Sequence, residues 1–366
     1  MTRFTRRDML AQSALALVGA SAASGATLSP SENLKDHAAR AGLVYGAAFT
    51  TENWDAPGCR PLYERETAIV TTDLELKFAA LRPSIETFNF EPADRLVGWA
   101  RSAGLLVRGH TLIWNESNPD WLKRCSSREI ARIFDQHIEL VVSRYAGRIH
   151  TWDVVNEPFW PDHGAAGGYR RGPWFDALGP SYVSRALKRV RAIDPAAKLC
   201  INEAHCELDN SWGQGIRPCL ARLVDELRQA DVPLDAVGFQ AHLLPGLPHD
   251  YPAFAAYARK IAALGVDLHI TELDIDDASF PDPVPTRDRM AAAYTADFLK
   301  QVLAIPQIKM VINWELADPW SHYVHAALQT NSNALRLPRP LPFDDKLRPK
   351  PLMASLVSAF DARTRS

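Results

Sequence analysis

The sequence has no strong excess of charge of either sign and no apolar run long enough to cross a membrane. Its 41 Lys and Arg residues nearly balance its 43 Asp and Glu residues, which gives a formal net charge of −2. No dense basic run follows the first residues, so the electrostatic signature of nucleic-acid or anionic-membrane binding is missing. There is also no CxxC motif or Cys/His spacing typical of structural zinc. These features favour a neutral partner, with no nucleic acid and no metal.

The first 26 residues show the pattern of an export signal. Arg6 and Arg7 precede an apolar stretch over residues 11–23, which ends in small residues with A-x-A sites. The arginine pair resembles a twin-arginine signal. A membrane anchor is the alternative, but it needs ~20 continuous apolar residues, and this stretch is shorter. We expect a cleaved signal over residues 1–26 and a periplasmic or extracellular protein without membrane contact after cleavage.

The remainder of the chain, residues 27–366, is predicted to be one domain. It contains no Pro/Ser/Gly-rich linker, no short repeat and no low-complexity tract. Apolar residues at 47% and charged residues at 23% are typical of a soluble globular protein with a sizeable core. We expect a monomer. The five cysteines are an odd number, so at least one of them stays unpaired within it.

Short apolar segments alternate with longer stretches of helical periodicity, which is the pattern of repeated βα units and a parallel sheet. The helical patterns cover residues 93–103, 127–145, 181–193, 216–229, 251–264 and 287–303, and Ser126 with Glu129 predicts a capped start for the second of them. The candidate strands are residues 43–49, 73–78, 105–110, 149–155, 198–202, 236–240, 267–271 and 308–314. This pattern predicts an α/β fold of the (β/α)8 TIM-barrel type.

Polar residues gather at the carboxyl ends of these strands, where (β/α)8 barrels build their active sites. Among them, Glu157 follows the fourth strand and Glu272 follows the seventh. A pair of carboxyl groups is what glycoside hydrolysis requires, because one donates a proton to the leaving oxygen while the other, ionised, meets the developing oxocarbenium ion. In a retaining enzyme the two groups lie about 5 to 5.5 Å apart. The ten tryptophans offer indole faces on which sugar rings can stack.

The motifs around these glutamates resemble glycoside hydrolase family 10, which consists of (β/α)8-barrel endo-β-1,4-xylanases acting with retention. The resemblance extends from about residue 43 to the C-terminus. It rests on Trp-Asp-Val-Val-Asn-Glu at 152–157, Ile-Thr-Glu-Leu-Asp at 270–274, Arg-Gly-His-Thr-Leu-Ile-Trp at 108–114, Val-Gly-Phe-Gln-Ala-His-Leu at 237–243 and Pro-Phe-Asp at 342–344. One such motif is a weak signal, whereas this ordered set is a strong one.

By matching position, the resemblance implies that Glu157 is the acid/base and Glu272 the nucleophile. It implies that Asn156 hydrogen-bonds the 2-hydroxyl of the sugar in the cleavage subsite. The remaining carried-over residues would line the glycone side (Lys77, His110, Gln240, His242 and Trp314), lie beneath a sugar ring (Trp114) or fix the tautomer of His242 (Asp274). Lys77 has a structural alternative, since it can pair with Asp73 or Glu75. Two carboxylates suffice for this chemistry, so no cofactor is expected.

The walls around the glutamates depart from the family pattern. The changed positions are Asp73 and Leu74 for Glu-Asn, Asn115 for His, Ala204 for Tyr, Glu315 for Gly and His322 for Trp. The substrate is therefore less firmly indicated than the chemistry. Xylan or xylo-oligosaccharides come first. A retaining β-1,4-glycanase acting on cellulose or mixed-linkage glucan, and a non-catalytic glycan-binding barrel, stay open as alternatives. The roles of Glu203 and His205, after the fifth strand, are also open.

Overall fold

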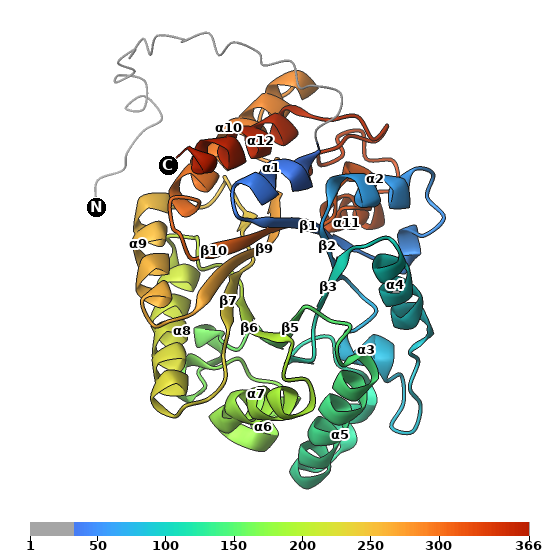
Figure 1. Cartoon of the computed structure of the whole chain (residues 1–366), viewed down its shortest axis with the longest axis vertical. Coiled ribbons are helices and arrows are strands. Elements are labelled where there is room, and N and C mark those ends of the chain that lie inside the picture. Colours follow the sequence, from blue (N-terminus) through green and yellow to red (C-terminus); the bar gives the residue numbers. More distant parts are fainter. Residues whose placement is uncertain (1–32, 366) are drawn as a thin grey trace, which may run out of the picture. The chain divides into compact units, whose positions relative to one another are not determined.

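The predicted βα units close into a barrel. The computed structural model describes residues 33–365, so the predicted export signal over residues 1–26 lies outside the described residues. Neighbouring strands pair in parallel, and β10 pairs with both β1 and β9, which closes the ring (Figure 1). The barrel strands are β1 (Val44–Phe49), β2 (Ile69–Thr72), β3 (Leu106–Gly109), β5 (Thr151–Asn156), β6 (Lys198–Glu203), β7 (Ala236–Phe239), β9 (Asp267–Ile275) and β10 (Ile308–Asn313). The prediction of a (β/α)8 barrel is confirmed.

Two short strands extend the barrel at its carboxyl end. Strand β4 (Ile113–Trp114) pairs with the end of β5, and β8 (His242–Leu243) pairs with the end of β9. Both follow a barrel strand after a break of two or three residues. The extensions hold the side chains of Trp114 and His242 at the barrel mouth, where loops alone would hold them less firmly.

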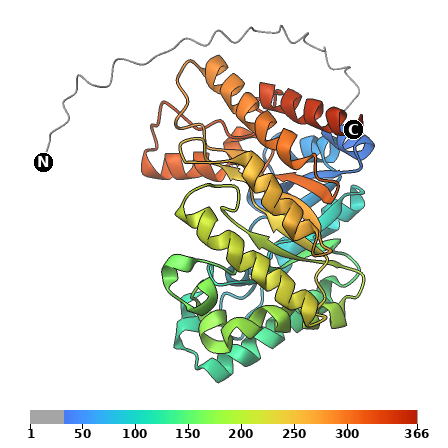
Figure 2. The ribbon, with the colours of Figure 1, turned by 90° about the vertical axis from the view of Figure 1, so that its left-hand side faces the viewer.

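Amphipathic helices cover the outer face of the barrel, and Figure 2 shows α8, α9 and α10 lying side by side. Helix α5 begins and ends where predicted, and Ser126 and Glu129 form the predicted capping box. The larger helices are α4 (Glu91–Ser102), α5 (Ser127–Tyr145), α7 (Tyr182–Ile193), α8 (Ser211–Gln229), α9 (Tyr251–Ala262), α10 (Val284–Val302) and α12 (Pro351–Thr364). The shorter ones are α1 (Leu34–Arg40), α2 (Cys59–Glu66), α3 (Phe78–Leu81), α6 (Pro173–Leu178) and α11 (His322–Thr330).

The second strand was predicted at the wrong place. Strand β2 is Ile69–Thr72, whereas residues 73–77 form a turn and Phe78 begins α3. The alternation of Leu74, Leu76 and Phe78 imitates a strand, but Leu76 and Phe78 are buried as part of the hydrophobic core. The run Ile-Val-Thr-Thr is β-branched throughout and buried throughout, which favours it as the strand. Residues 73–77 therefore lie beyond the strand, at the carboxyl rim.

Helix α8 begins five residues before its predicted start at Ile216. The side chain of Asn210 caps it by accepting hydrogen bonds from the backbone N–H groups of Trp212 and Gly213. Gly213 and Gly215, in the first two turns, hide the helical pattern in the sequence. Gly213 is required there, because a Cβ atom would lie 2.1 Å from the carbonyl oxygen of Leu208.

The described chain contains neither a membrane span nor a disulfide. Within residues 33–365, no helix is both long and apolar enough to cross a bilayer. All five cysteines belong to the described part and all are unpaired, with four of them buried. The expectation of at least one unpaired cysteine is met.

A buried ion pair ties the barrel strands together from inside. Arg108 on β3 donates from Nε to Asp153 Oδ2 on β5 over 2.9 Å, and a second guanidinium nitrogen donates to Asp153 Oδ1. The same guanidinium lies 2.9 Å from His269 Nδ1 on β9 and 3.2 Å from Cys200 Sγ on β6. Burial disfavours the charge of Asp153, but Arg108 and His110 outweigh it and lower its pKa to about 2. The pair thus orients His110, whose Nδ1 lies 3.1 Å from Asp153.

Replacing Asp153 with Asn should lower the free energy of unfolding by about 3–5 kcal/mol, because it leaves the Arg108 charge buried without a partner. Urea unfolding near neutral pH measures this loss. The matched control is Asp94→Asn, because the partner of Asp94, Arg144, is at the surface. This variant should lower the free energy of unfolding by only about 0.2–1 kcal/mol.

The difference in the free energy of unfolding between the wild type and Asp153→Asn should also depend on pH. Folding lowers the pKa of Asp153 from ~3.9 to about 2. Its ionised form therefore contributes stability above about pH 4, and this contribution is lost as the pH falls toward about 2. A difference that does not shrink at acidic pH would contradict the assigned charge state.

Candidate active site

The ten residues predicted for the site form one connected group at the carboxyl ends of the strands. Each contacts at least one other member through a hydrogen bond, an ion pair or a ring contact. The group consists of Lys77, His110, Trp114, Asn156, Glu157, Gln240, His242, Glu272, Asp274 and Trp314. Strands β3, β4, β5, β7, β8, β9 and β10 all end in or beside this group.

Glu157 directly follows β5 in a left-handed backbone conformation with φ of 48°. Its backbone N–H donates to the carbonyl oxygen of Asn202 over 2.8 Å, which holds this turn against β6. The carboxylate accepts hydrogen bonds from Gln240 Nε2 over 2.9 Å at one oxygen and from Trp114 Nε1 over 3.2 Å at the other. The side chain is 14% exposed, so it can reach a ligand in the barrel mouth.

Glu272 lies within β9 and is more deeply buried, with its side chain 7% exposed. Asn202 Nδ2 donates to its Oε1 over 2.7 Å, and His242 Nε2 lies 3.0 Å from its Oε2. Burial alone would raise the pKa of Glu272, but the hydrogen bond from His242 and the nearby His110 outweigh it and lower the pKa. The carboxylate is therefore ionised near neutral pH, which is the state that its predicted role as nucleophile requires.

His242 lies between two carboxylates. Its Nδ1 is 2.8 Å from Asp274 Oδ1, and its Nε2 is 3.0 Å from Glu272 Oε2. Burial opposes a charged ring, yet Asp274 and Glu272 raise the pKa of His242 well above its ordinary value. The contact expected between Asp274 and His242 is therefore present in a different form. Asp274 faces a protonated ring that donates from both nitrogens, and not one neutral tautomer.

Lys77 makes both kinds of contact that the sequence suggested, an ion pair with Asp73 and contacts with predicted site residues. Its Nζ donates to Asp73 Oδ1 over 3.1 Å, and it also lies 5.7 Å from the ring centroids of both Trp114 and Trp314. The ammonium group is thus held over two aromatic faces at the mouth by its ion pair. Such a geometry contributes cation–π attraction and presents a hydrogen-bond donor to a ligand.

Asn202, at the end of β6, is a site residue that the sequence did not identify. Its Nδ2 donates to both Glu272 Oε1 and Asn156 Oδ1, over 2.7 and 2.9 Å. Its own Oδ1 accepts from Thr271 Oγ1 over 2.6 Å, which fixes the orientation of the amide. A Cβ atom at Gly238 on the neighbouring strand would lie 2.4 Å from that Oδ1, so glycine at this position makes room for the Asn202 side chain. The signal was its position as a polar residue at a strand end.

Arg170 is a second residue that the sequence did not identify. It is buried, and its Nη2 lies 2.9 Å from Glu157 Oε2 while its Nε donates to the Glu157 carbonyl oxygen over 3.1 Å. The guanidinium stacks 4.7 Å from the ring centroid of Trp160 and also pairs with Glu116. Arg170 follows a 3-10 turn and not a strand. A search for polar residues at strand ends therefore does not identify it. It fixes both the backbone and the carboxylate of Glu157.

The departures from the family pattern have separate structural outcomes. Asn115 is buried, and its Oδ1 accepts the backbone N–H groups of Trp174 and Phe175 at the start of α6, so it acts on the scaffold. Leu74 lines a small hollow with Thr50 and Pro92. Ala204 is buried.

Glu315 and His322 are the two departures beyond β10. Glu315 has φ of 75° and accepts a hydrogen bond from Tyr63 Oη over 2.6 Å. Burial, with the charge of Asp73 adding to it, raises the pKa of Glu315 well above its usual value. His322 begins α11 and places its Nδ1 3.6 Å from Asp274 Oδ2.

The two residues left open also differ in their surroundings. Glu203 is fully buried and accepts backbone N–H groups from Phe159 and Ala204. Burial raises the pKa of Glu203 well above its usual value, and the charge of Glu157 raises it further. His205 packs against Trp160 and Trp212, with ring centroids 5.8 and 5.2 Å away.

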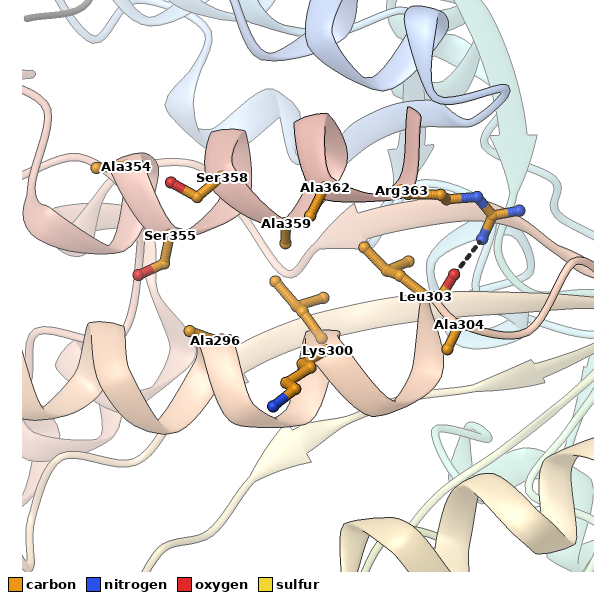
Figure 3. A pocket seen from close by; sticks show the side chains of 11 residues that line it. Ala296, Lys300, Leu303, Ala304, Ala354, Ser355, Ser358, Ala359, Ala362 and Arg363 are labelled. Carbon is orange, nitrogen blue, oxygen red and sulfur yellow. Dashed lines mark hydrogen bonds between the residues drawn. The ribbon is translucent and has the colours of Figure 1, made fainter. Parts of the chain in front are cut away.

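A groove lies between α10 and α12, on the side where Arg363 reaches the beginning of β10 at Ile308 (Figure 3). Its volume is about 600 Å³, and Ala and Leu side chains make up most of its lining. Arg363 crosses one end and donates to the carbonyl oxygen of Leu303 over 3.1 Å. None of the described residues that line this groove has a carboxylate, and these residues therefore do not supply a pair of carboxyl groups. The candidate site is the barrel mouth.

The barrel and its mouth define a class of protein. Two carboxylates, one of them buried and ionised, stand at the carboxyl rim of a (β/α)8 barrel among tryptophans and amide donors. That combination is the machinery of a glycoside hydrolase.

Comparison with known proteins identifies the family. The model of glycosyl hydrolase family 10 matches residues 33–359. Endo-1,4-beta-xylanase C of Phanerodontia chrysosporium is 32% identical over 80% of this chain and 69% of its own length. Endo-1,4-beta-xylanase B of Thermotoga neapolitana is 30% identical over 84% and 85%. The chain belongs to glycosyl hydrolase family 10.

Solved structures agree with this assignment. Native xylanase 10B from Thermotoga maritima superposes with a TM-score of 0.80 at 26% identity, covering 91% of this chain and 99% of that chain. Xylanase 10B from Thermotoga petrophila, solved in complex with xylobiose, gives a TM-score of 0.79 at 26% identity, covering 91% and 98%.

Replacing Arg170 with Met should lower the kcat for glycoside hydrolysis by about a hundredfold, because a small displacement of a catalytic group costs that much. KM should change little, since Arg170 contacts Glu157 rather than the open mouth. Arg170→Lys should recover part of the rate.

The matched control is Arg171→Met, because the neighbouring Arg171 is exposed and forms its ion pair with Asp176 at the surface. Its kcat should equal that of the wild type, and thermal melting should show both variants folded. An unchanged kcat in Arg170→Met would contradict the positioning role.

Proposed function

We propose that the protein hydrolyses internal β-1,4-xylosidic bonds of xylan or xylo-oligosaccharides with retention of configuration. Glu157 acts as the acid/base and Glu272 as the nucleophile. The observation that carries the proposal is the continuous set of hydrogen bonds Glu157–Asn156–Asn202–Glu272 across the barrel mouth. This chain of amides holds the two carboxyl groups in a fixed relation, and we expect the spacing of about 5 to 5.5 Å of a retaining pair.

In the first step, Glu272 Oε attacks the anomeric carbon and the bond to the leaving oxygen breaks. Glu157 gives its proton to that oxygen, which departs as a free hydroxyl. The product on the enzyme is an ester between the sugar and Glu272. In the second step, Glu157 takes a proton from water, the water oxygen attacks the anomeric carbon, and Glu272 leaves as a carboxylate. Two inversions give net retention.

The neighbouring side chains support these two roles. Asn202 and His242 each donate to one oxygen of Glu272, which restricts its rotation and stabilises its charge before attack and on departure. Gln240, Trp114 and Arg170 contact Glu157. The Arg170 contact suits the ionised form, which is the base of the second step. Asn156 lies between Glu157 and Asn202 and contacts both of them. A sugar 2-hydroxyl in the cleavage subsite would meet it there.

The glycone side is formed by the remaining predicted residues. Lys77, His110, His242 and Trp314 line it, and Trp114 provides a ring face on which a sugar can stack. Support for xylan as the polymer comes from the similarity to endo-1,4-beta-xylanases and from a similar barrel solved in complex with xylobiose. A non-catalytic binding barrel is not favoured, because both carboxylates and their donors are in place.

The test is a panel of xylan, cellulose, mixed-linkage glucan and mannan, with NMR of the first product formed from xylo-oligosaccharides. We expect hydrolysis of xylan and the β-anomer as the first product. Glu157→Ala should lower the rate on xylan by about 10²–10⁴-fold.

Azide separates the two roles. With an activated aryl xylobioside, Glu272→Ala should form the α-glycosyl azide, whereas Glu157→Ala should form the β-glycosyl azide. In each variant the azide ion attacks from the face of the sugar that the missing carboxylate occupied. An α-anomer as first product from the wild type would sink retention, and swapped azide products would exchange the two roles.

We also propose that the protein is exported by the twin-arginine-type signal over residues 1–26 to the periplasm or the medium, and that it acts as a monomer. Support for export comes from the Arg6-Arg7 pair and the short apolar stretch after it.

Arg6→Lys with Arg7→Lys keeps the charge and removes the pair, so it should hold the protein inside the cell in fractionation experiments. Arg3→Lys is the matched control and should be exported normally. Equal export of all three would contradict a twin-arginine signal.

A further inference from the structure

Three potential metal ligands meet at the edge of the barrel mouth. His242 on β8, Asp274 on β9 and His322 at the start of α11 each offer one donor atom, and these atoms all lie within 4.8 Å of one another. His322 is the new element, because it replaces the tryptophan of the family pattern. The two imidazole rings approach edge to face with centroids 5.4 Å apart.

One oxygen of this cluster has no hydrogen-bond partner among the described residues. Asp274 is 1% exposed, and its Oδ1 contacts His242 while its Oδ2 is buried and unpaired. His322 Nδ1 lies 3.6 Å from this Oδ2 atom, which is too far for a hydrogen bond. A buried carboxylate oxygen without a partner costs free energy, so a cation that reaches it is favoured.

The donor set fits a borderline divalent ion. Two imidazole nitrogens and one carboxylate suit Zn²⁺ and its neighbours Co²⁺ and Ni²⁺, whereas Ca²⁺ and Mg²⁺ prefer oxygen ligands alone. Three protein ligands leave a fourth tetrahedral position for water. If His242 binds through Nδ1, its Nε2–H still donates to Glu272 over 3.0 Å. A metal-bound histidine commonly donates its second N–H to a carboxylate in this way.

We propose that His242, Asp274 and His322 bind one Zn²⁺-class ion, which lowers turnover while it is bound. The ion takes the place of the proton on His242 Nδ1, and that proton goes to solvent. The bound ion and its water occupy the glycone side beside the nucleophile and withdraw charge from Glu272 through the His242 ring. The effect on turnover rests on the proposed function, whereas binding itself does not.

Calorimetry of the full chain after chelator treatment, with ZnCl₂ as the titrant, tests the site. We expect one ion per chain in the wild type and binding weakened by more than about tenfold in His322→Trp, since even the loss of an outer partner costs this much. The matched control is His325→Trp. His325 is exposed on the same helix and is no part of the cluster, so its binding should equal that of the wild type.

A spectroscopic readout distinguishes this site from other histidines. Co²⁺ should give the strong visible bands of a tetrahedral ion in wild type and His325→Trp, and weak octahedral bands in His322→Trp. If thermal melting shows His322→Trp unfolded, His322→Gln takes its place.

The outcomes separate the metal site from the enzyme activity. Xylan hydrolysis that falls with Zn²⁺ in the wild type, recovers with chelator and is less sensitive in His322→Trp supports the whole proposal. No binding, or equal binding in His322→Trp, overturns it while leaving the hydrolase intact. Zn²⁺ binding by a chain that hydrolyses nothing would refute the proposed function and leave the metal site standing.

Discussion

Glu272 carries a negative charge inside the barrel mouth, and the surrounding structure stabilises that charge. An ionised carboxylate so far from water is costly unless hydrogen bonds and an opposite charge compensate it. Asn202 and His242 do so, one at each oxygen. Both donors depend on further contacts, because Thr271 orients Asn202 and Asp274 faces the second nitrogen of His242. The charge of this one carboxylate thus requires hydrogen-bonding partners from three strands.

The parallel register brings these partners together. Asn156 on β5 pairs with Asn202 on β6, and His242 on β8 pairs with Asp274 on β9. Residues that pair across parallel strands and point into the barrel meet at one level, so each polar group finds a partner from the neighbouring strand. Below them, the Arg108–Asp153 pair holds the ring of His110 toward the mouth. The barrel therefore supplies both the rigidity and the hydrogen bonds that the site needs.

Most of the barrel could be predicted, because its helices and strands have distinct periods and the motifs that resemble the family stand at strand ends. The second strand was misplaced, since Leu76 and Phe78 alternate like strand residues although they are buried in a turn and a short helix. Asn202 was not identified from the sequence, because its role between Asn156 and Glu272 depends on strand register, which the sequence does not state. Arg170 reaches Glu157 from a loop thirteen residues on, and no local pattern predicts that contact.

The residues that depart from the family pattern differ in what they contact. Asn115 supports the start of α6 and contacts Tyr182 on α7, whereas His322 adds a donor atom beside Asp274. The account rests on Glu272 as the residue that bonds to the sugar. The most direct test is to treat the protein with a 2-deoxy-2-fluoro xylobioside that has a good leaving group, and to sequence the labelled peptide by mass spectrometry. The account predicts one sugar on the peptide that contains Glu272, attached at that carboxylate. A label on another residue, or no label while xylan is cleaved, would contradict it.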